Sequence, residues 1–211
     1  MEHKGSRETY DYIADWIAPN FCYSKKDVWH RMGMVGIFGD YVLSCTQGDI
    51  LEIGAGESSI YLTAIAKKYS RHIYICDISP SKIDNPLTIQ GYLAPECSTF
   101  FRCESNKIFK DISTPLALAF IDGDHNYEQA RMDFDNTLPH IVDHGYVLLH
   151  DTYPPDDSYL HENACGGVYR LRQEIELDKR LDCITLPKGT AMGVGLTIVR
   201  KKPTDRDYFN A

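Results

Sequence analysis

Two aspartates and two histidines stand where two successive apolar runs of the sequence end. Asp122 and His125 follow one run, and His150 and Asp151 close the next. If these runs are neighbouring parallel strands, their carboxyl ends share one edge of a sheet, and the four side chains cluster there. Histidine has an ordinary pKa near neutrality, so His125 among carboxylates is a candidate general base. The alternative is that both aspartates only cap the turns after their strands and that His125 bonds to loop backbone.

A glycine-rich turn follows an earlier apolar run. It contains Gly54 and Gly56, and such glycines let the chain turn tightly and let a ligand approach the backbone. Asp77 stands about 20 residues further on, at the end of the next apolar run, where a carboxylate can accept both ribose hydroxyls of a nucleotide. An ordinary strand-to-helix turn is the alternative. The apolar run before the turn and the helical pattern after it favour nucleotide binding.

The residues around this turn limit which nucleotide it suits. Acidic Glu52 precedes the turn, and Ser59 occupies the position of the third glycine that is usual in NAD-binding motifs. A carboxylate at this point would repel a pyrophosphate and suits a cationic ligand.

The elements that must position these residues alternate between short apolar runs and helical stretches. Strands are predicted at 50–53, 73–76, 99–103, 116–121, 146–150, 182–186 and 195–199, and helices at 58–69, 127–139 and 167–179. Strands that alternate with helices imply right-handed crossovers and a parallel sheet. The last two strands are separated by about eight residues with Gly and Pro, which favours an antiparallel hairpin. Residues 80–97 are predicted as a short helix and loop.

Composition excludes several classes of function. The chain has 211 residues, and 22 basic against 30 acidic side chains give a net charge of −8, so it lacks the broad basic surface of a nucleic-acid-binding protein. No apolar run approaches the roughly 18–20 residues of a membrane span, and the N-terminus has no signal-peptide pattern. Seven cysteines without a C-x-x-C pair are typical of free thiols, and we expect a cytoplasmic location.

The acidic residue followed by G-x-G resembles the first motif of class I S-adenosylmethionine-dependent methyltransferases. The resemblance implies a Rossmann-like, seven-stranded, mostly parallel α/β sheet with an antiparallel C-terminal hairpin and helices on both faces. It implies S-adenosyl-L-methionine as the cofactor, with its ribose on Asp77 and its adenine near Glu104 and Ser105. The cofactor-binding residues that it implies are Glu52, Gly54, Gly56, Ser58, Asp77, Glu104, Ser105 and Asp122.

A narrower resemblance rests on three further segments. Residues 120–127 and 145–152 look like the Asp-Gly-x-His-x-Tyr and His-Asp-Thr signatures of a subgroup of small methyltransferases, and residues 166–170 also fit it. This subgroup includes relatives of sugar and natural-product O-methyltransferases. The match covers about residues 48–201. We therefore expect an N-terminal helical extension or lid at 1–47, a methyltransferase domain at 48–202 and a C-terminal tail at 203–211.

The same positions resemble the centre of catechol-type O-methyltransferases. That family binds a divalent cation with acids at positions like Asp122 and Asp151, and it uses a base three residues beyond the first, which is His125 here. Thr152 stands where that family usually has Asn. Two carboxylates suit Mg²⁺, which keeps several waters and needs few protein ligands. Metal-assisted transfer and metal-free base catalysis by His125 both stay open.

The expected function is S-adenosylmethionine-dependent methylation of a small molecule, at a hydroxyl group. The alternatives are a nicotinamide-dependent oxidoreductase and a catalytically silent S-adenosylmethionine-binding module. Glu52 and the absent third glycine argue against the first, and the set of Asp122, His125 and Asp151 argues against the second. We expect no nucleic-acid partner and no membrane contact, and a homo-oligomer is among the states that the sequence leaves open.

Overall fold

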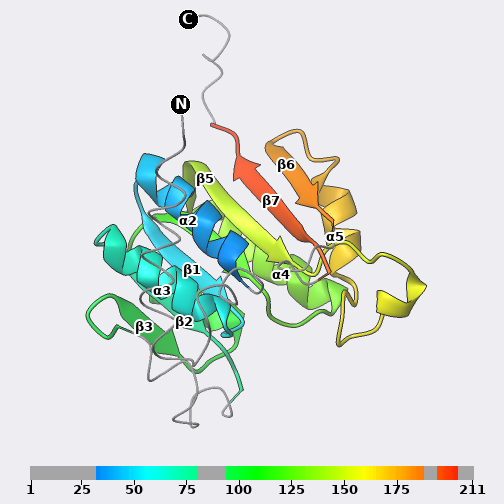
Figure 1. The fold of residues 1–211 in the computed structure, drawn as a ribbon, viewed down its shortest axis with the longest axis horizontal. Helices are drawn as coiled ribbons and strands as arrows, with labels where there is room; N and C mark the ends of the chain where they lie inside the picture. Colours follow the sequence, from blue (N-terminus) through cyan, green and yellow to red (C-terminus); the bar gives the residue numbers. More distant parts are fainter. Residues whose placement is uncertain (1–31, 80–93, 188–193, 204–211) are drawn as a thin grey trace, which may run out of the picture.

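The computed structural model describes residues 32–79, 94–187 and 194–203. Within them, seven strands form one sheet in the order β3-β2-β1-β4-β5-β7-β6 (Figure 1). The strands are β1 (Asp49–Ile53), β2 (Ile73–Cys76), β3 (Ser98–Phe101), β4 (Leu116–Ile121), β5 (Ile141–His150), β6 (Leu181–Leu186) and β7 (Leu196–Lys201). The α-helices are α2 (Gly33–Cys45), α3 (Ser58–Lys68), α4 (Tyr127–Thr137) and α5 (Val168–Ile175), and the 3-10 helices are η4 (Ser105–Lys110), η5 (Leu138–His140) and η6 (Asp157–Tyr159).

The first five strands run parallel, and the last two reverse direction. β1 pairs with β2 and β4, β2 with β3, and β4 with β5, all in parallel, whereas β7 pairs antiparallel with both β5 and β6. Every residue of β2 and β4 is buried, as expected when helices cover both faces of a parallel sheet. The predicted α/β fold with its C-terminal hairpin is confirmed.

Helices cover the two faces of the sheet in two separate cores. α2 and α3 pack on one face, where Ile50 of β1 joins their apolar side chains, and α4 and α5 pack on the other face with Leu51 (Figure 1). Successive side chains of a strand point to opposite faces, so Glu52 lies on the same face as Ile50. This alternation decides which residues of β1 can reach which side of the sheet edge.

Two elements differ from their predicted bounds by four residues or more, and one helix was not predicted. β5 begins at Ile141 and not at 146, because a bulge brings the polar segment 143–145 into the strand: Leu116 pairs with Ile141, but Leu118 pairs with Tyr146. α5 ends at Ile175, well before 179. Leu177, which the sequence pattern assigns to the apolar side of that helix, is 82% exposed. The sequence did not predict η4, which begins at Ser105.

Some predictions lie wholly or partly outside the described residues. Residues 1–31 of the predicted helical extension and most of the segment 80–97 belong to this group, and the domain boundaries stay predictions. Of the predicted helical extension, α2 is described, and it packs on α3. No helix in the described ranges is long and apolar enough to span a membrane. The cysteines that the structure describes are free thiols, as predicted.

Candidate functional site

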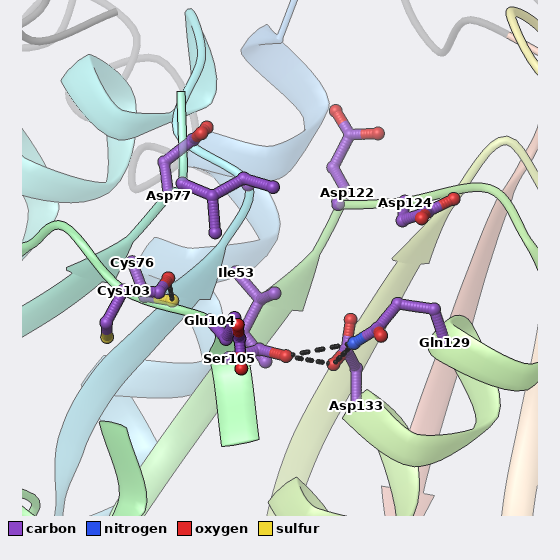
Figure 2. A pocket seen from close by; sticks show the side chains of 13 residues that line it. Ile53, Cys76, Asp77, Cys103, Glu104, Ser105, Asp122, Asp124, Gln129 and Asp133 are labelled. Atoms are coloured by element: carbon purple, nitrogen blue, oxygen red, sulfur yellow. Dashed lines mark hydrogen bonds between the residues drawn. The ribbon is translucent and has the colours of Figure 1, made fainter. Parts of the chain in front are cut away.

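A cleft of about 360 Å³ opens at the carboxyl ends of β1, β2 and β4 (Figure 2). Its walls come from these strand ends, from the segment after β3 and from the first turns of α4. Five acidic side chains line it: Asp77, Glu104, Asp122, Asp124 and Asp133. None of the described residues that line the cleft is basic. The cleft therefore carries a negative potential that favours a cationic ligand.

Gly54 and Gly56, the two glycines of the turn after β1, have different surroundings. Gly54 has a φ of +90°, and a Cβ built on it would lie 2.0 Å from the carbonyl oxygen of Asp122. Gly54 thus lets the ends of β1 and β4 touch. Gly56 has no such neighbour: its nearest described atom would be Ser58 Oγ, 3.8 Å away. The open side of the turn is at Gly56, whereas Gly54 lines the cleft only with its backbone.

Asp77 is held in place by backbone donors. The N–H of Ala55 donates to its Oδ2 at 2.9 Å, and the N–H of Ser79 donates to its Oδ1 at 2.7 Å. The side chain lines the cleft and is 9% exposed. Asp77 therefore joins the glycine-rich turn to the end of β2 and faces the cleft from the predicted ribose position.

Glu52 and Ser58 lie behind the turn. Glu52 is fully buried on the α3 face of the sheet, and the Ser58 hydroxyl donates to its Oε1 at 2.5 Å. Neither residue lines the cleft. The predicted contact between Glu52 and the cofactor's ammonium group stays a prediction, whereas its contact with Ser58 orders the first turn of α3.

A buried polar network forms the floor of the cleft. The Ser105 hydroxyl donates to Asp133 Oδ1, and Gln129 Nε2 donates to the same oxygen at 2.7 Å and to Ser105 Oγ at 3.1 Å (Figure 2). An acidic residue on a helix usually faces solvent, but Asp133 of α4 is 1% exposed. Burial raises the pKa of the Asp133 carboxyl, and the bonds from Ser105 and Gln129 oppose the rise. Its helical spacing with buried Ala130 was the signal in the sequence.

Replacing Asp133 with alanine should lower the free energy of unfolding by about 1–3 kcal/mol, because Ser105 and Gln129 lose their buried acceptor. Asp135→Ala is the matched control on the same helix, since Asp135 is 52% exposed and pairs with Arg131. An exposed pair of this kind should contribute less than about 0.5 kcal/mol. Urea unfolding of both variants measures the difference. Equal losses would show that the network does not stabilise the cleft.

Beside the cleft, the structure brings together the four residues that the sequence placed at the ends of β4 and β5. His150 Nδ1 lies 3.2 Å from Asp122 Oδ1 and 3.3 Å from Asp151 Oδ2. His125 Nε2 lies 3.6 Å from each of the same two oxygens. We call these four residues the Asp–His cluster. The predicted clustering is confirmed, and His150 lies closer to the carboxylates than the predicted base His125 does.

The charges of the Asp–His cluster shift its pKa values in opposite directions. Burial alone would raise the pKa of Asp122, but the contacts with His125 and His150 outweigh it and hold that pKa well below its usual range. Burial would lower the pKa of His150, yet Asp122 and Asp151 raise it to about 10. The contact with Asp122 also raises the pKa of His125. The two imidazoles thus balance two carboxylates that would otherwise repel each other.

Local backbone geometry fixes the Asp–His cluster. Asp151 has a φ of +54°, and its Oδ1 accepts a hydrogen bond of 2.9 Å from the N–H of Val194, just before β7. The carbonyl oxygen of His125 accepts a bond of 2.7 Å from the N–H of Gly167. A Cβ on neighbouring Gly166 would lie 2.3 Å from that oxygen, so the glycine pair packs directly on His125. From the sequence, this glycine pair was noted only because residues 166–170 resemble the methyltransferase subgroup.

A second hollow of about 420 Å³ adjoins the Asp–His cluster on its other side. His125 and Tyr127 line it, together with Leu160 and the segment from Gly166 to Arg170. Asp124 lines both the cleft and this hollow. The arrangement leaves room for one ligand on each side of the cluster, with His125 facing the second.

Residues 51–152 match the model of a protein family described as a methyltransferase domain. No curated protein sequence matches the chain significantly.

Among solved structures, an O-methyltransferase from Bacillus cereus in complex with SAH is 14% identical, with a TM-score of 0.62 over 96% of this chain and 92% of that one. The O-methyltransferase TomG from Streptomyces achromogenes, in complex with SAM and involved in tomaymycin synthesis, is 15% identical, with the same TM-score and coverage. The SAH-bound methyltransferase PaMTH1 from Podospora anserina is 16% identical, with a TM-score of 0.62 over 95% and 88% of the two chains.

At these identities the likeness to solved structures is one of fold. The family match favours the methyltransferase over the oxidoreductase that the sequence left as an alternative. It confirms the prediction of a methyltransferase, because residues 51–152 match the model of a methyltransferase domain.

Proposed function

We propose that this protein is an S-adenosylmethionine-dependent methyltransferase that acts on a hydroxyl group of a small molecule. The observation that carries the proposal is the charge of the cleft, where five acidic side chains and no basic one face the ligand among the described lining residues. A sulfonium cation suits that potential, whereas the pyrophosphate of a nicotinamide dinucleotide would be repelled. The SAM and SAH named for structures of the same fold agree with this choice.

The proposed reaction is an in-line displacement at the methyl carbon. The acceptor oxygen forms a bond to that carbon, the carbon–sulfur bond breaks, and sulfur keeps the electron pair as the thioether of S-adenosylhomocysteine. Most of the catalysis is positioning, which the cleft supplies for the cofactor and the second hollow for the acceptor. The second hollow, of about 420 Å³, has room for an acceptor such as a phenol or a sugar from the predicted O-methyltransferase subgroup.

The Asp–His cluster would remove the proton of the acceptor. In one route, His125 takes the proton at Nε2, and Asp122 and Asp151, each 3.6 Å from that nitrogen, stabilise the imidazolium that forms. In the other route, Asp122 and Asp151 would hold a divalent cation, which would supply the Lewis acidity that lowers the pKa of a hydroxyl. Asp122, His125 and Asp151 each offer a ligand atom within 4.8 Å of the others, so the donor set fits a cation as well as a base.

S-adenosylhomocysteine should bind to the full-length protein in calorimetry, and Asp77→Ala should weaken this binding about tenfold or more, since a charge-assisted bond contributes about 1.5–3 kcal/mol. NADH should not bind. Asp143→Ala, on the exposed polar segment of β5, is the charge-matched control. Because Asp77 also holds Ala55 and Ser79, the melting temperature of each variant is measured alongside.

Two results would count against the proposal. If the wild-type protein binds NADH and not S-adenosylhomocysteine, the function is wrong. If Asp77→Ala keeps its affinity and its melting temperature, Asp77 is not the ribose-binding acid.

A further inference from the structure

Two cysteines, Cys76 and Cys103, lie next to each other in the wall of the cleft (Figure 2). Cys76 is the last residue of β2, and Cys103 follows β3, the neighbouring strand of the sheet. The Cys76 thiol donates a hydrogen bond of 3.4 Å to the carbonyl oxygen of Cys103. The two side chains therefore share one wall of the cleft, on chain segments that are far apart in the sequence.

The two thiols differ in how easily an oxidant can reach them and react. Cys76 is 2% exposed, whereas Cys103 is half-buried. Burial raises the pKa of the Cys76 thiol, and the neighbouring Cys103 thiol raises it further. A small oxidant in the cleft would therefore react first at Cys103, because the thiolate is the reactive form of a cysteine. Cys76 is then held beside the oxidised sulfur, and this proximity offsets its small fraction of thiolate.

Each of these cysteines directly precedes a residue that the sequence assigns to cofactor binding. Asp77 follows Cys76 and faces the cleft from the predicted ribose position, and Glu104 follows Cys103 near the predicted adenine position. A disulfide needs Cβ atoms about 3.5–4.5 Å apart and a dihedral angle of about 90° around the sulfur–sulfur bond. Such a bond would fix the segment after β3 against the end of β2, and it would change the position of Glu104 relative to Asp77.

We infer that a peroxide converts Cys76 and Cys103 into a reversible disulfide and that this bond weakens cofactor binding in the cleft. The second part rests on the proposed function. The Cys103 sulfur first attacks a peroxide oxygen, the oxygen–oxygen bond breaks, and a sulfenic acid and one water form. The Cys76 sulfur then attacks the Cys103 sulfur, the sulfur–oxygen bond breaks, and the oxygen leaves as a second water with the proton of the Cys76 thiol. The two thiols together lose two electrons, and these reduce one peroxide to two waters.

Peptide mapping tests the disulfide on full-length protein that is treated with hydrogen peroxide, alkylated and digested with trypsin without reduction. Residues 72–82 should be released joined to residues 103–107, with a mass two hydrogen atoms below the sum of the free peptides. Dithiothreitol added before alkylation should abolish this species. The map needs no variant. If Cys76 stays free while Cys103 is oxidised further or joins another cysteine, the inference is overturned.

Calorimetry with S-adenosylhomocysteine measures the effect of the disulfide on the cleft. The oxidised protein should bind it about fivefold or more weakly, which is the size of one lost hydrogen bond, and dithiothreitol should restore the affinity. Because binding and oxidation are linked, saturating S-adenosylhomocysteine should lower the ratio of disulfide to dithiol in a glutathione redox buffer by the same factor. Equal affinity of the oxidised and reduced proteins would overturn the inference.

Cys103→Ser should abolish the joined peptides and give the same affinity before and after peroxide treatment. Cys183→Ser is the matched control, because Cys183 is also half-buried but lies on β6 and does not line the cleft. This control should lose affinity on oxidation as the wild type does. A loss of affinity in peroxide-treated Cys103→Ser would assign the effect to another residue and overturn the inference.

The unoxidised wild-type protein separates this inference from the proposed function. If it binds S-adenosylhomocysteine and the disulfide does not form, only the inference about the two cysteines is wrong. If the disulfide forms and the unoxidised protein does not bind S-adenosylhomocysteine, the disulfide stands and the proposed function fails.

Discussion

Replacing Gly54 with alanine should cost the protein roughly 3–5 kcal/mol of folding free energy, whereas Gly56→Ala should change it by less than about 1 kcal/mol. The difference follows from the backbone. Gly54 has a φ of +90°, which residues other than glycine rarely adopt. A Cβ added there would lie 2.0 Å from the Asp122 carbonyl oxygen. Backbone at the end of β4 would have to move to make room. Gly56 meets nothing closer than 3.8 Å in the described part of the chain.

Urea unfolding followed by circular dichroism measures both changes. If Gly54→Ala does not fold, its soluble yield beside that of Gly56→Ala gives the same comparison. If Gly56→Ala lost more unfolding free energy than Gly54→Ala, the close contact between the ends of β1 and β4 would be contradicted. A loss of S-adenosylhomocysteine binding in stable Gly56→Ala would place the cofactor against the open side of the turn.

Replacing His125 with alanine should lower the turnover number by about 10²–10⁴-fold while the affinity for S-adenosylhomocysteine stays within about threefold of that of the wild type. His125 lines the second hollow and not the cleft, so its loss affects the acceptor side. The His125 imidazole contacts both carboxylates of the Asp–His cluster. As the proposed base, it would take the proton of the acceptor hydroxyl.

The measurement is the release of S-adenosylhomocysteine with the best acceptor from a panel of phenols and sugars. His140→Ala should keep its turnover number, since His140 lies outside both hollows. Normal turnover in His125→Ala would remove this residue from the reaction. The acceptor would then be a group that is already nucleophilic, such as an amine or a thiol.

The sequence was sufficient to predict the fold because β2 and β4 are short, apolar runs between helical stretches. β2 and β4 have no exposed residue, and only a parallel sheet that is covered on both faces buries strands in this way. The start of β5 could not be predicted, because the polar segment 143–145 interrupts the apolar pattern. The bulge that admits this segment depends on pairing with Leu116 and Leu118 of another strand.

The candidate site was predictable where chain order alone brings residues together. Asp122, His125 and Asp151 follow adjacent strands, and the fold had to gather them. The sequence could not show that Gly54 packs against another strand while Gly56 stays open. That difference depends on where the end of β4 lies relative to Gly54. The network of Asp133 was missed because the acidic side chain, read alone, indicates solvent, although its position on α4 is a buried one.

The bond between Gly167 and His125 has a consequence for engineering acceptor specificity. The segment from Leu160 to Arg170 contributes to the wall of the second hollow, and it is joined to the proposed base His125 through a glycine pair that no other residue type can replace without a clash. A library that varies residues 156–163 while it keeps Gly166 and Gly167 can change the shape of the hollow and leave the imidazole where it is. Loop grafts from other enzymes should be joined on the N-terminal side of Gly166, because a junction beyond it would change the shape of the second hollow and the position of His125 at once.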